Sequence, residues 1–600
     1  MYTITGKFQD AQSGEAISYE IIDFDNGMQV VTNSLGYYSL DVEPCWSDTL
    51  RPVSDNYNFD PEYRVYTQVT EDYNNQDYLA YEISTQPPPG WEYVNTGYVH
   101  IISVKASIIP NLCGIPLEPG DWIGVFYIGD DGEYHCGGAE IWLGDENIPV
   151  VAQGNDPYTP EKDGFSYGEM FNWIVYKPYT DEKEFIAVPV YDSCLGCTTS
   201  NKFSGGQSPA LSILDELNVF YNHKIEIPNG WSGISSHLIP NVYPITTLMS
   251  PIIENLVLIQ TLTKMYYPSA GINTIGFWNS HQGYKIKVSE ATTLPLLGCP
   301  DANKTLNFTT TWNIFPVLSS CNVQTSDIFG SVTDDLVVIK EIGGVNIYWP
   351  AMGIYTLSVL EPGKAYMAAV TSNVSITFPD CTGMKSAVES NAAFVNESPW
   401  EMPEFTASTH TIALKGEGLS GFSAGDYVGA FTADGTCAGI TMIGQPGQSV
   451  ALNVFGDDIS TAAIEGFTEG EPMLFRVYYQ QSGEISDAEA IFDPALPASG
   501  GLFADNGISA ISNLKATATG ISGGAGQQVT LYPNPSDGNV TFDAGSFECE
   551  VTITDIKGQE LFRRFLTGKQ QLDLSGFEKG VYFVRISGAE FSNTKKLILK

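Results

Sequence analysis

The chain consists of short runs of β-branched and aromatic residues, and turn residues end almost every run. Runs such as VHIISVKA, DYVGAF, LFRVYYQ and VYFVRI are bounded by Gly, Pro, Asn or Asp. With 59 glycines and 34 prolines, few stretches are long enough to show the helical period of 3.6 residues. This pattern predicts an all-β chain with a few short helices, and residues 326–336 are one helical candidate.

Internal repeats divide the chain, which at 600 residues is too long for one hydrophobic core. The motif GDWIGVF returns as GDYVGAF, and GFSYGEMFNWIVY aligns without a gap on GFTEGEPMLFRVY. In each copy an Asp-Gly turn and then a cysteine, Cys136 or Cys437, follow the first motif. We therefore expect one β module to occur twice, as module copy 1 (87–222) and module copy 2 (384–516).

A second duplicated unit lies between the two module copies. ENLVLIQ is answered by DDLVVIK, and MYYPSAGIN by IYWPAMGIY. The spacing from the proline of the second motif to a following tyrosine is sixteen residues in both copies. These matches predict two similar β units packed together, central unit copy 1 (223–300) and central unit copy 2 (301–383).

The charge balance excludes some classes of partner. The chain has 28 Lys and Arg residues against 70 Asp and Glu residues, a formal net charge of -42. Such a surface repels phosphate backbones and anionic lipids, so we expect no nucleic-acid partner and no binding to membrane surfaces. No segment approaches the roughly 20 apolar residues of a transmembrane helix.

The ten cysteines are too few for a disulfide-dense scaffold of this length. Cys194 and Cys197 form a CxxC pair, but no second CxxC completes a zinc site. The flanking residues also lack the strand-to-helix context of a thioredoxin-type motif. We favour local disulfides formed in an oxidising compartment.

Two stretches fit the nucleophile-elbow pattern G-x-S-x-G, with Ser166 and Ser423 at the serine position. An elbow needs a strand followed by a helix, and neither stretch has that helix. In the repeat alignment Ser166 falls opposite Thr468, and Ser423 opposite Glu118. Both stretches are therefore interpreted as Gly-rich turns, and no catalytic residue is assigned.

No metal ligand is assigned either. The six histidines lack metal-binding spacing and are expected at the surface or in turns: His100, His135, His223, His237, His281 and His410. Acidic pairs such as Asp130-Asp131 and Asp457-Asp458 cannot be placed across a cleft from sequence alone. We expect no cofactor, with structural calcium in Asp-rich loops as the alternative.

Aromatic side chains are the remaining lead to a binding function. Trp231 and Trp312 occupy matched positions of the central units, which favours a role as core anchors. Trp142 and Trp278 have no match and are the candidates for exposed contacts with sugar rings or partner surfaces. Core packing is nevertheless the favoured interpretation for both.

Residues 1–86 resemble the prealbumin-like, carboxypeptidase-regulatory-like β-sandwich modules of secreted bacterial proteins. The resemblance depends on the segment TNSLGYYSLDV and on a set of spaced residues: Trp46, Tyr57, Phe59, Pro61, Tyr66, Gln76, Asp77 and Tyr78. Cys45 departs from the pattern, which has glycine before the tryptophan. The resemblance implies a structural spacer or an adhesive module.

The end of the chain reads as a separate small domain. A Gly/Ser/Ala linker is expected at 517–528, and Pro533 and Pro535 then favour an extended lead into the domain. Asp537-Gly538 supplies a turn, and alternating runs such as VTITDI and VYFVRI follow. These features alone predict an Ig-like sandwich of about seven short strands over 529–600.

The same residues resemble the type A C-terminal sorting domain of cargo for the type IX secretion system of Bacteroidota. The residues that carry the resemblance are Tyr532, Pro533, Asn534, Pro535, Gly538, Asp555, Gly558, Gly580, Tyr582 and Lys596. It implies recognition by the outer-membrane translocon, cleavage by a sorting peptidase, and attachment to lipopolysaccharide or release. Such export also needs a signal peptide, which is not found after Met1, so we expect a truncated or processed chain.

Together these features predict a secreted or cell-surface protein of tandem β-sandwich modules that acts in adhesion, ligand binding or display. A glycan or a surface protein is the expected ligand, and no catalysis is expected. The alternative is the non-catalytic C-terminal part of an exported hydrolase that degrades polysaccharide or protein.

Overall fold

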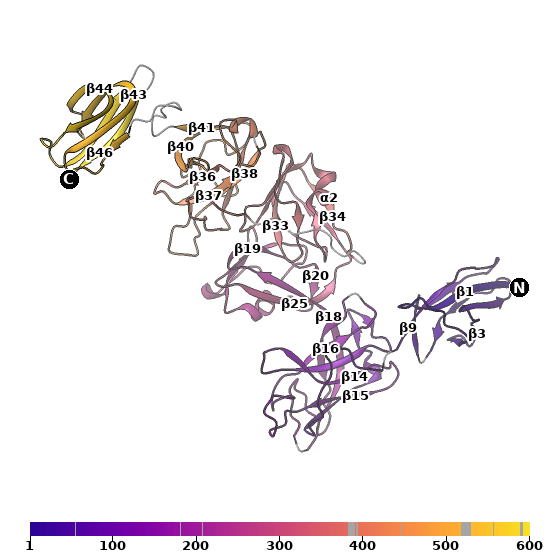
Figure 1. Cartoon of the computed structure of the whole chain (residues 1–600). Coiled ribbons are helices and arrows are strands. Elements are labelled where there is room, and N and C mark those ends of the chain that lie inside the picture. Colours follow the sequence, from indigo (N-terminus) through magenta and orange to yellow (C-terminus); the bar gives the residue numbers. More distant parts are fainter. Residues whose placement is uncertain are drawn as a thin grey trace.

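The computed structural model describes residues 1–600 except 55, 84, 181, 207, 382–390, 392–393, 446, 518–529, 556 and 588–591. Strands make up 48% of the chain and helices 5%, which confirms the all-β prediction. Figure 1 shows the modules following one another in chain order from the N-terminus. The α-helices are short, α1 (Ile245–Leu248) and α2 (Thr325–Phe329), and α2 overlaps the predicted helical segment 326–336.

The N-terminal module has a four-stranded sheet of order β4-β1-β9-β7 and a three-stranded sheet of order β3-β2-β6. Phe8 stacks on Tyr78 in its core, with ring centroids 4.9 Å apart. The rings of Tyr81 and Tyr179 meet at 4.6 Å where this module contacts module copy 1. The strands are β1 (Tyr2–Asp10), β2 (Ile21–Phe24), β3 (Gln29–Val31), β4 (Tyr37–Val42), β5 (Asp48–Leu50), β6 (Pro52–Val53), β7 (Tyr57–Asp60), β8 (Arg64–Tyr66) and β9 (Tyr78–Glu82).

The seven strands of module copy 2 close into a barrel in the order β35-β38-β37-β36-β39-β40-β41. The closure depends on β35, which pairs antiparallel with β38 and parallel with β41. Closure leaves no unpaired sheet edge. The strands are β35 (Thr409–Leu414), β36 (Tyr427–Phe431), β37 (Cys437–Met442), β38 (Val450–Phe455), β39 (Leu474–Tyr479), β40 (Glu484–Phe492) and β41 (Ile508–Thr517).

Module copy 1 has equivalent strand pairings, but its strands belong to an 11-stranded sheet that also includes two strands of central unit copy 1. Its first strand also pairs antiparallel with one neighbour and parallel with the last strand. The two repeated motifs form equivalent strands, and the register shifts at the same place in each, between Val125 and Phe126 and between Ala430 and Phe431. The strands are β10 (Val99–Val104), β11 (Asn111–Leu112), β12 (Ile115–Pro116), β13 (Trp122–Ile128), β14 (Tyr134–Ile141), β15 (Ile148–Gln153), β16 (Asn172–Tyr176), β17 (Glu184–Tyr191) and β18 (Ala210–Ile227).

The central units have matching five-stranded sheets, of order β19-β24-β21-β22-β23 in copy 1 and β27-β33-β29-β30-β31 in copy 2. Each copy also contains one of the short helices. The strands of copy 1 are β19 (Gly230–Ile234), β20 (Leu238–Pro240), β21 (Leu256–Gln260), β22 (Met265–Tyr267), β23 (Ile272–Asn273), β24 (Tyr284–Val288) and β25 (Thr292–Pro300). Those of copy 2 are β26 (Thr305–Phe308), β27 (Thr311–Pro316), β28 (Val323–Gln324), β29 (Leu336–Glu341), β30 (Ile347–Trp349), β31 (Ile354–Tyr355), β32 (Val359–Leu360), β33 (Ala365–Val370) and β34 (Val374–Thr377).

Strand β18 belongs to two modules. Its first part pairs with β10 and β17 in module copy 1, and its last part pairs with β25 in central unit copy 1. Figure 1 shows β18 at this position, between β16 and β25. A disulfide between Cys113 and Cys299 crosses the same boundary. Module copy 1 and central unit copy 1 are therefore joined both by a continuous strand and by a covalent bond.

Module copy 2 packs on central unit copy 2 through a small apolar core. Trp349 and Val338 from the central unit meet Ala413 and Ala510 from the module, and all four are buried. The two alanines have side chains small enough to let the indole approach their strands closely. This contact and the polar contacts described below form the joint between module copy 2 and the central units.

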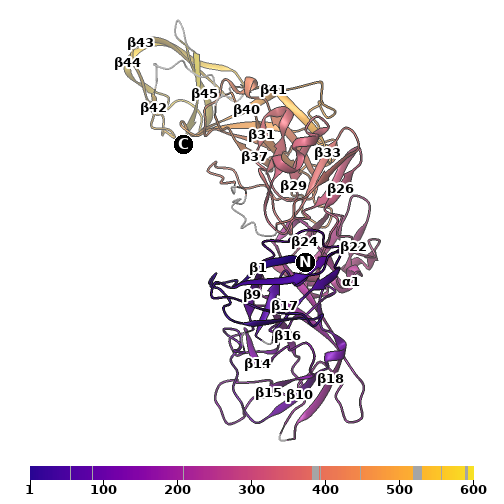
Figure 2. The ribbon, with the colours of Figure 1, turned by 90° about the vertical axis from the view of Figure 1, so that its right-hand side faces the viewer.

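The C-terminal domain has five described strands in one sheet, of order β42-β43-β45-β46 with β44 on β43. About seven short strands were predicted; β43 and β44 are long, and a register shift between Asp543 and Glu548 divides their pairing into two stretches. Apart from Thr517, the predicted linker 517–528 lies outside the described residues. The strands are β42 (Thr530–Tyr532), β43 (Asn539–Thr554), β44 (Glu560–Asp573), β45 (Gly580–Ser587) and β46 (Ser592–Leu599); Figure 2 shows several of them from a second side.

Candidate functional site

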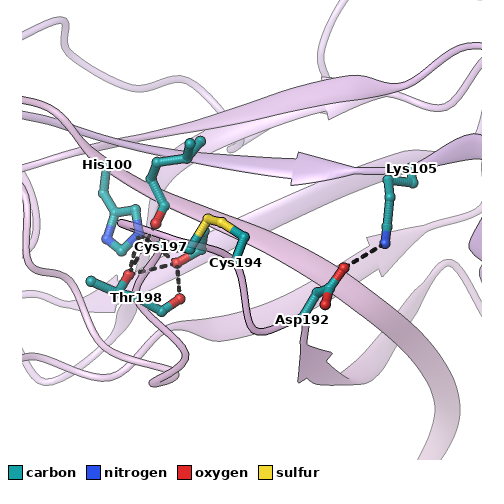
Figure 3. Close-up of a disulfide and its surroundings, with 8 residues drawn as sticks. His100, Lys105, Asp192, Cys194, Cys197 and Thr198 are labelled. Atoms are coloured by element: carbon teal, nitrogen blue, oxygen red, sulfur yellow. Dashed lines mark hydrogen bonds and ion pairs between the residues drawn. A yellow bond between two sulfur atoms is a disulfide. The ribbon is translucent and has the colours of Figure 1, made fainter.

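Each module copy buries one histidine against one serine. His100 Nε2 lies 2.8 Å from Ser212 Oγ in copy 1, and His410 Nε2 lies 2.9 Å from Ser509 Oγ in copy 2. Figure 3 shows His100 beside Thr198 and the Cys194–Cys197 disulfide. Both histidines were predicted at the surface or in turns, but both are fully buried. The sequence conceals the pairs because their members are 112 and 99 residues apart.

The hydrogen bonds of these histidines do not fit a catalytic dyad. The backbone N–H of Ser204 donates to Nδ1 of His100, and that of Ala504 donates to Nδ1 of His410. Because Nδ1 accepts, the neutral ring carries its proton on Nε2, which then donates to the serine. A general base needs an unprotonated Nε2 facing the hydroxyl. Burial lowers the pKa of both histidines to about 4, which keeps both rings neutral.

The two serines of the G-x-S-x-G stretches lie in turns, as predicted. The backbone N–H of Ser166 donates to the Glu169 carboxylate at 2.8 Å. That of Ser423 donates to the Asp426 carboxylate, also at 2.8 Å. Neither serine is followed by a helix. Each segment is therefore a turn that a nearby carboxylate stabilises.

Trp142 and Trp278 are core residues, which agrees with the favoured interpretation and excludes them as exposed contacts. Their exposed fractions are 2% and 3%, and Trp278 stacks on Tyr284 with ring centroids 4.4 Å apart. Equivalent backbone hydrogen bonds show that Ile443 occupies in module copy 2 the position that Trp142 occupies in module copy 1. Similarly, Leu360 occupies in central unit copy 2 the position that Trp278 occupies in central unit copy 1. Both counterparts are buried and apolar, so the two positions face cores whichever side chain occupies them.

Trp231 and Trp312 are mostly buried, but they lie at the joint with module copy 2. Trp231 Nε1 donates to Asp458 Oδ2 at 2.5 Å, and Trp312 Nε1 donates to the Asn506 carbonyl at 3.0 Å. Asp458 also accepts from Lys287 Nζ at 2.7 Å. Burial raises the pKa of Asp458, but the hydrogen bonds from Lys287, Trp231 and Ser460 together outweigh burial and lower the pKa below its usual value. The carboxylate thus stays ionised at the joint.

A second lysine lies deeper in the joint. Lys340 Nζ donates to Thr409 Oγ1 at 2.6 Å and lies 4.3 Å from the centre of the Trp312 ring. Burial lowers the pKa of Lys340 well below its usual value, and the nearby Lys285 adds to this effect. The joint therefore combines apolar packing with hydrogen bonds that side chains of the central units donate to acceptors in module copy 2.

Three disulfides form among the described residues. Only Cys194–Cys197 is local; Cys321–Cys381 spans 60 residues and Cys113–Cys299 spans 186. The preference for local pairing therefore holds for one bond of three. The repeat-matched Cys136 and Cys437 are free thiols, and burial raises their pKa values to about 12 and about 11.

Two features are absent from the residues that the structure describes. No group of three or more His, Cys, Asp or Glu side chains among them could hold a metal ion. Among the same residues, no helix has the length and apolar character needed to cross a membrane.

The YPNP segment (532–535) of the C-terminal domain holds the last strand, β46, in place. Asn534 Nδ2 donates to the Lys596 carbonyl at 2.6 Å, and its Oδ1 accepts from the Ile598 N–H at 2.9 Å. Two residues on, the backbone of Ser536 exchanges hydrogen bonds with Ile598 and Lys600. Asn534 and Ser536 therefore fasten β46, at the end of the chain, to the entry of the domain.

Three of the predicted signal residues shape turns. Gly538 has φ +119°, and a Cβ there would lie 2.8 Å from Ser575 Cα, so only glycine fits without displacing the backbone. Asp555 Oδ1 accepts the N–H groups of Lys557 and Gln559, each at 2.8 Å. Gly558, with φ +81°, completes the turn between β43 and β44.

The remaining signal residues divide between core and surface. Tyr582 is 6% exposed and donates to the Glu578 carbonyl at 2.5 Å, and Gly580 pairs with Leu599 at the start of β45. In contrast, Tyr532 is 40% exposed, and the Lys569 ammonium lies 5.3 Å from its ring centre. The surface set is Tyr532, Pro533, Asn534, Pro535 and Lys596.

Residues 530–600 match the family model of the secretion system C-terminal sorting domain. No curated protein matches the chain. Solved structures with weak similarity include the Bacillus anthracis TIE protein, with 10% identity, 94% of this chain and 74% of that chain covered, and a TM-score of 0.10. A second is a biofilm associated protein, BSP domain, with 10% identity, 85% of this chain and 91% of that chain covered, and a TM-score of 0.11. A third is surface layer protein SbsC, domains 4–9, with 8% identity, 100% of this chain and 98% of that chain covered, and a TM-score of 0.09. TM-scores of this size do not indicate a shared fold.

The family match covers the C-terminal domain, in which Asn534 and Ser536 bind β46 and Gly538 and Asp555 shape turns. The match supports export by the type IX secretion system. The sorting tail points to a secreted protein with attachment at the cell surface or outer membrane.

Proposed function

We propose that the exported chain acts as a display and binding protein of the cell surface, in adhesion or ligand capture, and that it catalyses no reaction. The observation that carries the proposal is the continuous connection between modules in residues 87–516, which we call the body. Strand β18 runs unbroken from module copy 1 into central unit copy 1, and Cys113–Cys299 reinforces the crossing. An enzyme does not need such coupling between modules, whereas a protein that holds binding surfaces in fixed positions does.

The far end of the body supports the same proposal. Module copy 2 is held on both central units at once, because Asp458 binds Trp231 in the first and Thr409 binds Lys340 in the second. Bonds to two units restrict rotation of the module more than bonds to one. Binding surfaces on such a body keep their spacing, which favours multivalent capture.

The proposed absence of catalysis is supported by the buried histidines. In both Ser–His pairs the hydrogen-bond pattern puts the proton on the wrong nitrogen for general-base catalysis. The rival proposal is that the chain is a non-catalytic part of an exported hydrolase. It differs from ours only if a catalytic domain accompanies this chain in the cell.

Handling of the tail follows from the family resemblance and is part of the proposal. The exposed Tyr532 to Pro535 segment and Lys596 would be read by the translocon, and a sorting peptidase would then remove the domain. The body would be attached to surface lipopolysaccharide or released.

The test of the proposed function uses cells that export the chain. Deletion of 530–600 should retain the protein in the periplasm, whereas Asn241→Ala, an exposed change in a central unit, should leave export unchanged. Cells that display the full chain should bind a glycan or protein surface that cells lacking it do not bind. Turnover of a polysaccharide or protein substrate by the purified full chain would contradict the proposal.

A further inference from the structure

A cleft of about 470 Å³ lies where the two central units meet. Central unit copy 1 contributes residues 261–263 and 281–282, and central unit copy 2 contributes residues from β26 and β27. The volume is within the roughly 300–1,000 Å³ of small-molecule sites in proteins. No sequence motif indicates this cleft, because it forms only when the two repeated units pack together.

The cleft is uncharged in a strongly acidic chain. None of the described residues that line it is Asp, Glu, Lys or Arg, although the chain has a net charge of -42. Its polar lining consists of side-chain amides, hydroxyls and one imidazole: Thr261, Thr263, His281, Gln282, Asn303, Thr305, Asn307, Thr309 and Asn313. The Asp301 carboxylate beside the cleft is already paired with His281 Nε2 at 2.9 Å, so a charged ligand would lose hydration here without gaining an unpaired counter-charge, which disfavours ions.

Several of these groups are fixed in place and retain hydrogen-bonding capacity. Gln282 Nε2 donates to the carbonyls of Gly283 and Ile314, which leaves Oε1 as an acceptor. Asn307 Oδ1 accepts from Ser375 Oγ at 2.6 Å, which leaves its two N–H donors. Neither remaining group has a partner among the described residues. Fixed donors and acceptors that face one cleft are suited to hydroxyl groups, because a hydroxyl both donates and accepts.

Part of the lining is apolar. Leu262 is 46% exposed at the cleft, and the Trp312 indole lines it from the other unit. The Trp312 ring is held by its hydrogen bond to Asn506 and by Lys340, so its orientation is fixed. A sugar ring has hydroxyls at its edge and C–H groups on its faces, and such walls with polar groups at the rim complement both.

We propose that this cleft binds an uncharged saccharide. The inference rests on the proposed binding function and names its ligand class and position. An uncharged peptide is the competing occupant, since among the described residues β26 pairs only with β34 and its other edge is open to backbone pairing. A saccharide is favoured because the fixed groups identified above are side-chain groups, not backbone groups. The free groups in this cleft are on side chains of loops and of the outer face of β26.

The test uses the full chain and isothermal titration calorimetry with neutral tetrasaccharides of glucan, mannan, galactan and xylan. Asn307→Asp replaces the free N–H donors of Asn307 by a carboxylate with almost no change in shape, and Gln282→Met removes the free acceptor of Gln282 at similar side-chain length. Each variant should weaken binding of the recognised tetrasaccharide about tenfold, the size of one lost hydrogen bond and its desolvation. Asn241→Asp, an exposed change outside the cleft, should change affinity less than twofold.

Four results would overturn the inference: no neutral tetrasaccharide binds, both cleft variants bind as well as the parent, tetragalacturonate binds more tightly than any neutral sugar, or an uncharged hexapeptide competes with the sugar. Sugar binding that both variants leave intact would refute the cleft while supporting the binding function. Loss of cell-surface binding together with substrate turnover would refute the binding function itself. Circular dichroism of both variants should match the parent, since both positions are at a solvent-accessible cleft.

Discussion

The two module copies contain the same loop, but only one of the loops holds modules together. In copy 1 the backbone N–H of Tyr158 donates to Asp156 at 2.9 Å; in copy 2 that of Ser460 donates to Asp458 at 3.0 Å. The threonine that follows caps both loops through equivalent bonds. The loops therefore have one internal design.

Their surroundings differ. Asp458 is 6% exposed, and its second oxygen accepts from Trp231 and Lys287. Asp156 is half-buried, and its second oxygen has no partner among the residues that the structure describes. Copy 1 is joined to its central unit by β18 and a disulfide instead. The difference shows that a duplicated surface becomes a joint only where its neighbour supplies donors.

The largest expected effect concerns the covalent joint of copy 1. Replacing Cys113 and Cys299 by serine should lower the free energy of unfolding of this region by about 4 kcal/mol, because the bond closes a loop of 186 residues. Calorimetry of the full chain measures the change. Replacing Cys194 and Cys197 in the same way should cost clearly less, since they are three residues apart. Equal losses would contradict this ranking.

The joint of copy 2 should be weakened by Asp458→Ala. The change leaves the buried indole N–H of Trp231 without an acceptor and removes the counter-charge of Lys287, which keeps only its hydrogen bond to Ser460 Oγ, so we expect a loss of about 3 kcal/mol. Asp156→Ala is the matched control and should change stability by less than about 0.5 kcal/mol. Denaturant unfolding and hydrogen exchange of β35 measure both. Similar effects of the two changes would mean that the loops do not differ in function.

The two buried histidines should give the copies a common pH dependence. The folded-state pKa of each is about 4, below the usual 6.5, so the unfolded chain binds the proton more tightly. Stability should therefore fall as the pH drops from 6.5 towards 4. His100→Asn and His410→Asn should each remove part of this fall, by similar amounts, in unfolding curves recorded between pH 4 and 7. Because burial also lowers the pKa values of His223 and His237, to about 4 and about 3, part of the fall should remain in the double variant. A double variant whose stability falls as steeply as that of the parent would contradict the assignment.

The smallest effect is expected at the G-x-S-x-G serines. Ser166→Ala and Ser423→Ala keep the backbone N–H groups that bind Glu169 and Asp426, so stability should change by less than about 0.5 kcal/mol in either copy. Thermal unfolding measures the change. A large loss in one copy only would indicate a role for that hydroxyl.

Repeats made much of the fold predictable from the sequence. GDWIGVF and GDYVGAF become β13 and β36 with the same register shift, since equal patterns of side chains select equal strands. The turn residues Gly538 and Asp555 were also identifiable, because positive φ and side-chain capping restrict residue choice locally.

Contacts between distant segments were not predictable. Trp142 and Trp278 face cores, and a missing repeat match does not reveal which face of a strand or loop a side chain is on. The bond from Trp231 to Asp458 joins residues 227 apart, and the pairing of Cys113 with Cys299 spans 186. The uncharged cleft depends on how two units pack, which no local pattern encodes.

Strand β18 has a consequence for how the chain can change over time. Because side chains alternate along a strand, inserting one residue near its middle would turn every later side chain to the opposite face. Leu214 and Val219 point into the core of module copy 1, while Ile225 and Ile227 point into that of central unit copy 1. An insertion in this strand would thus disrupt packing in two cores at once, whereas an insertion in an exposed loop need not disrupt any core.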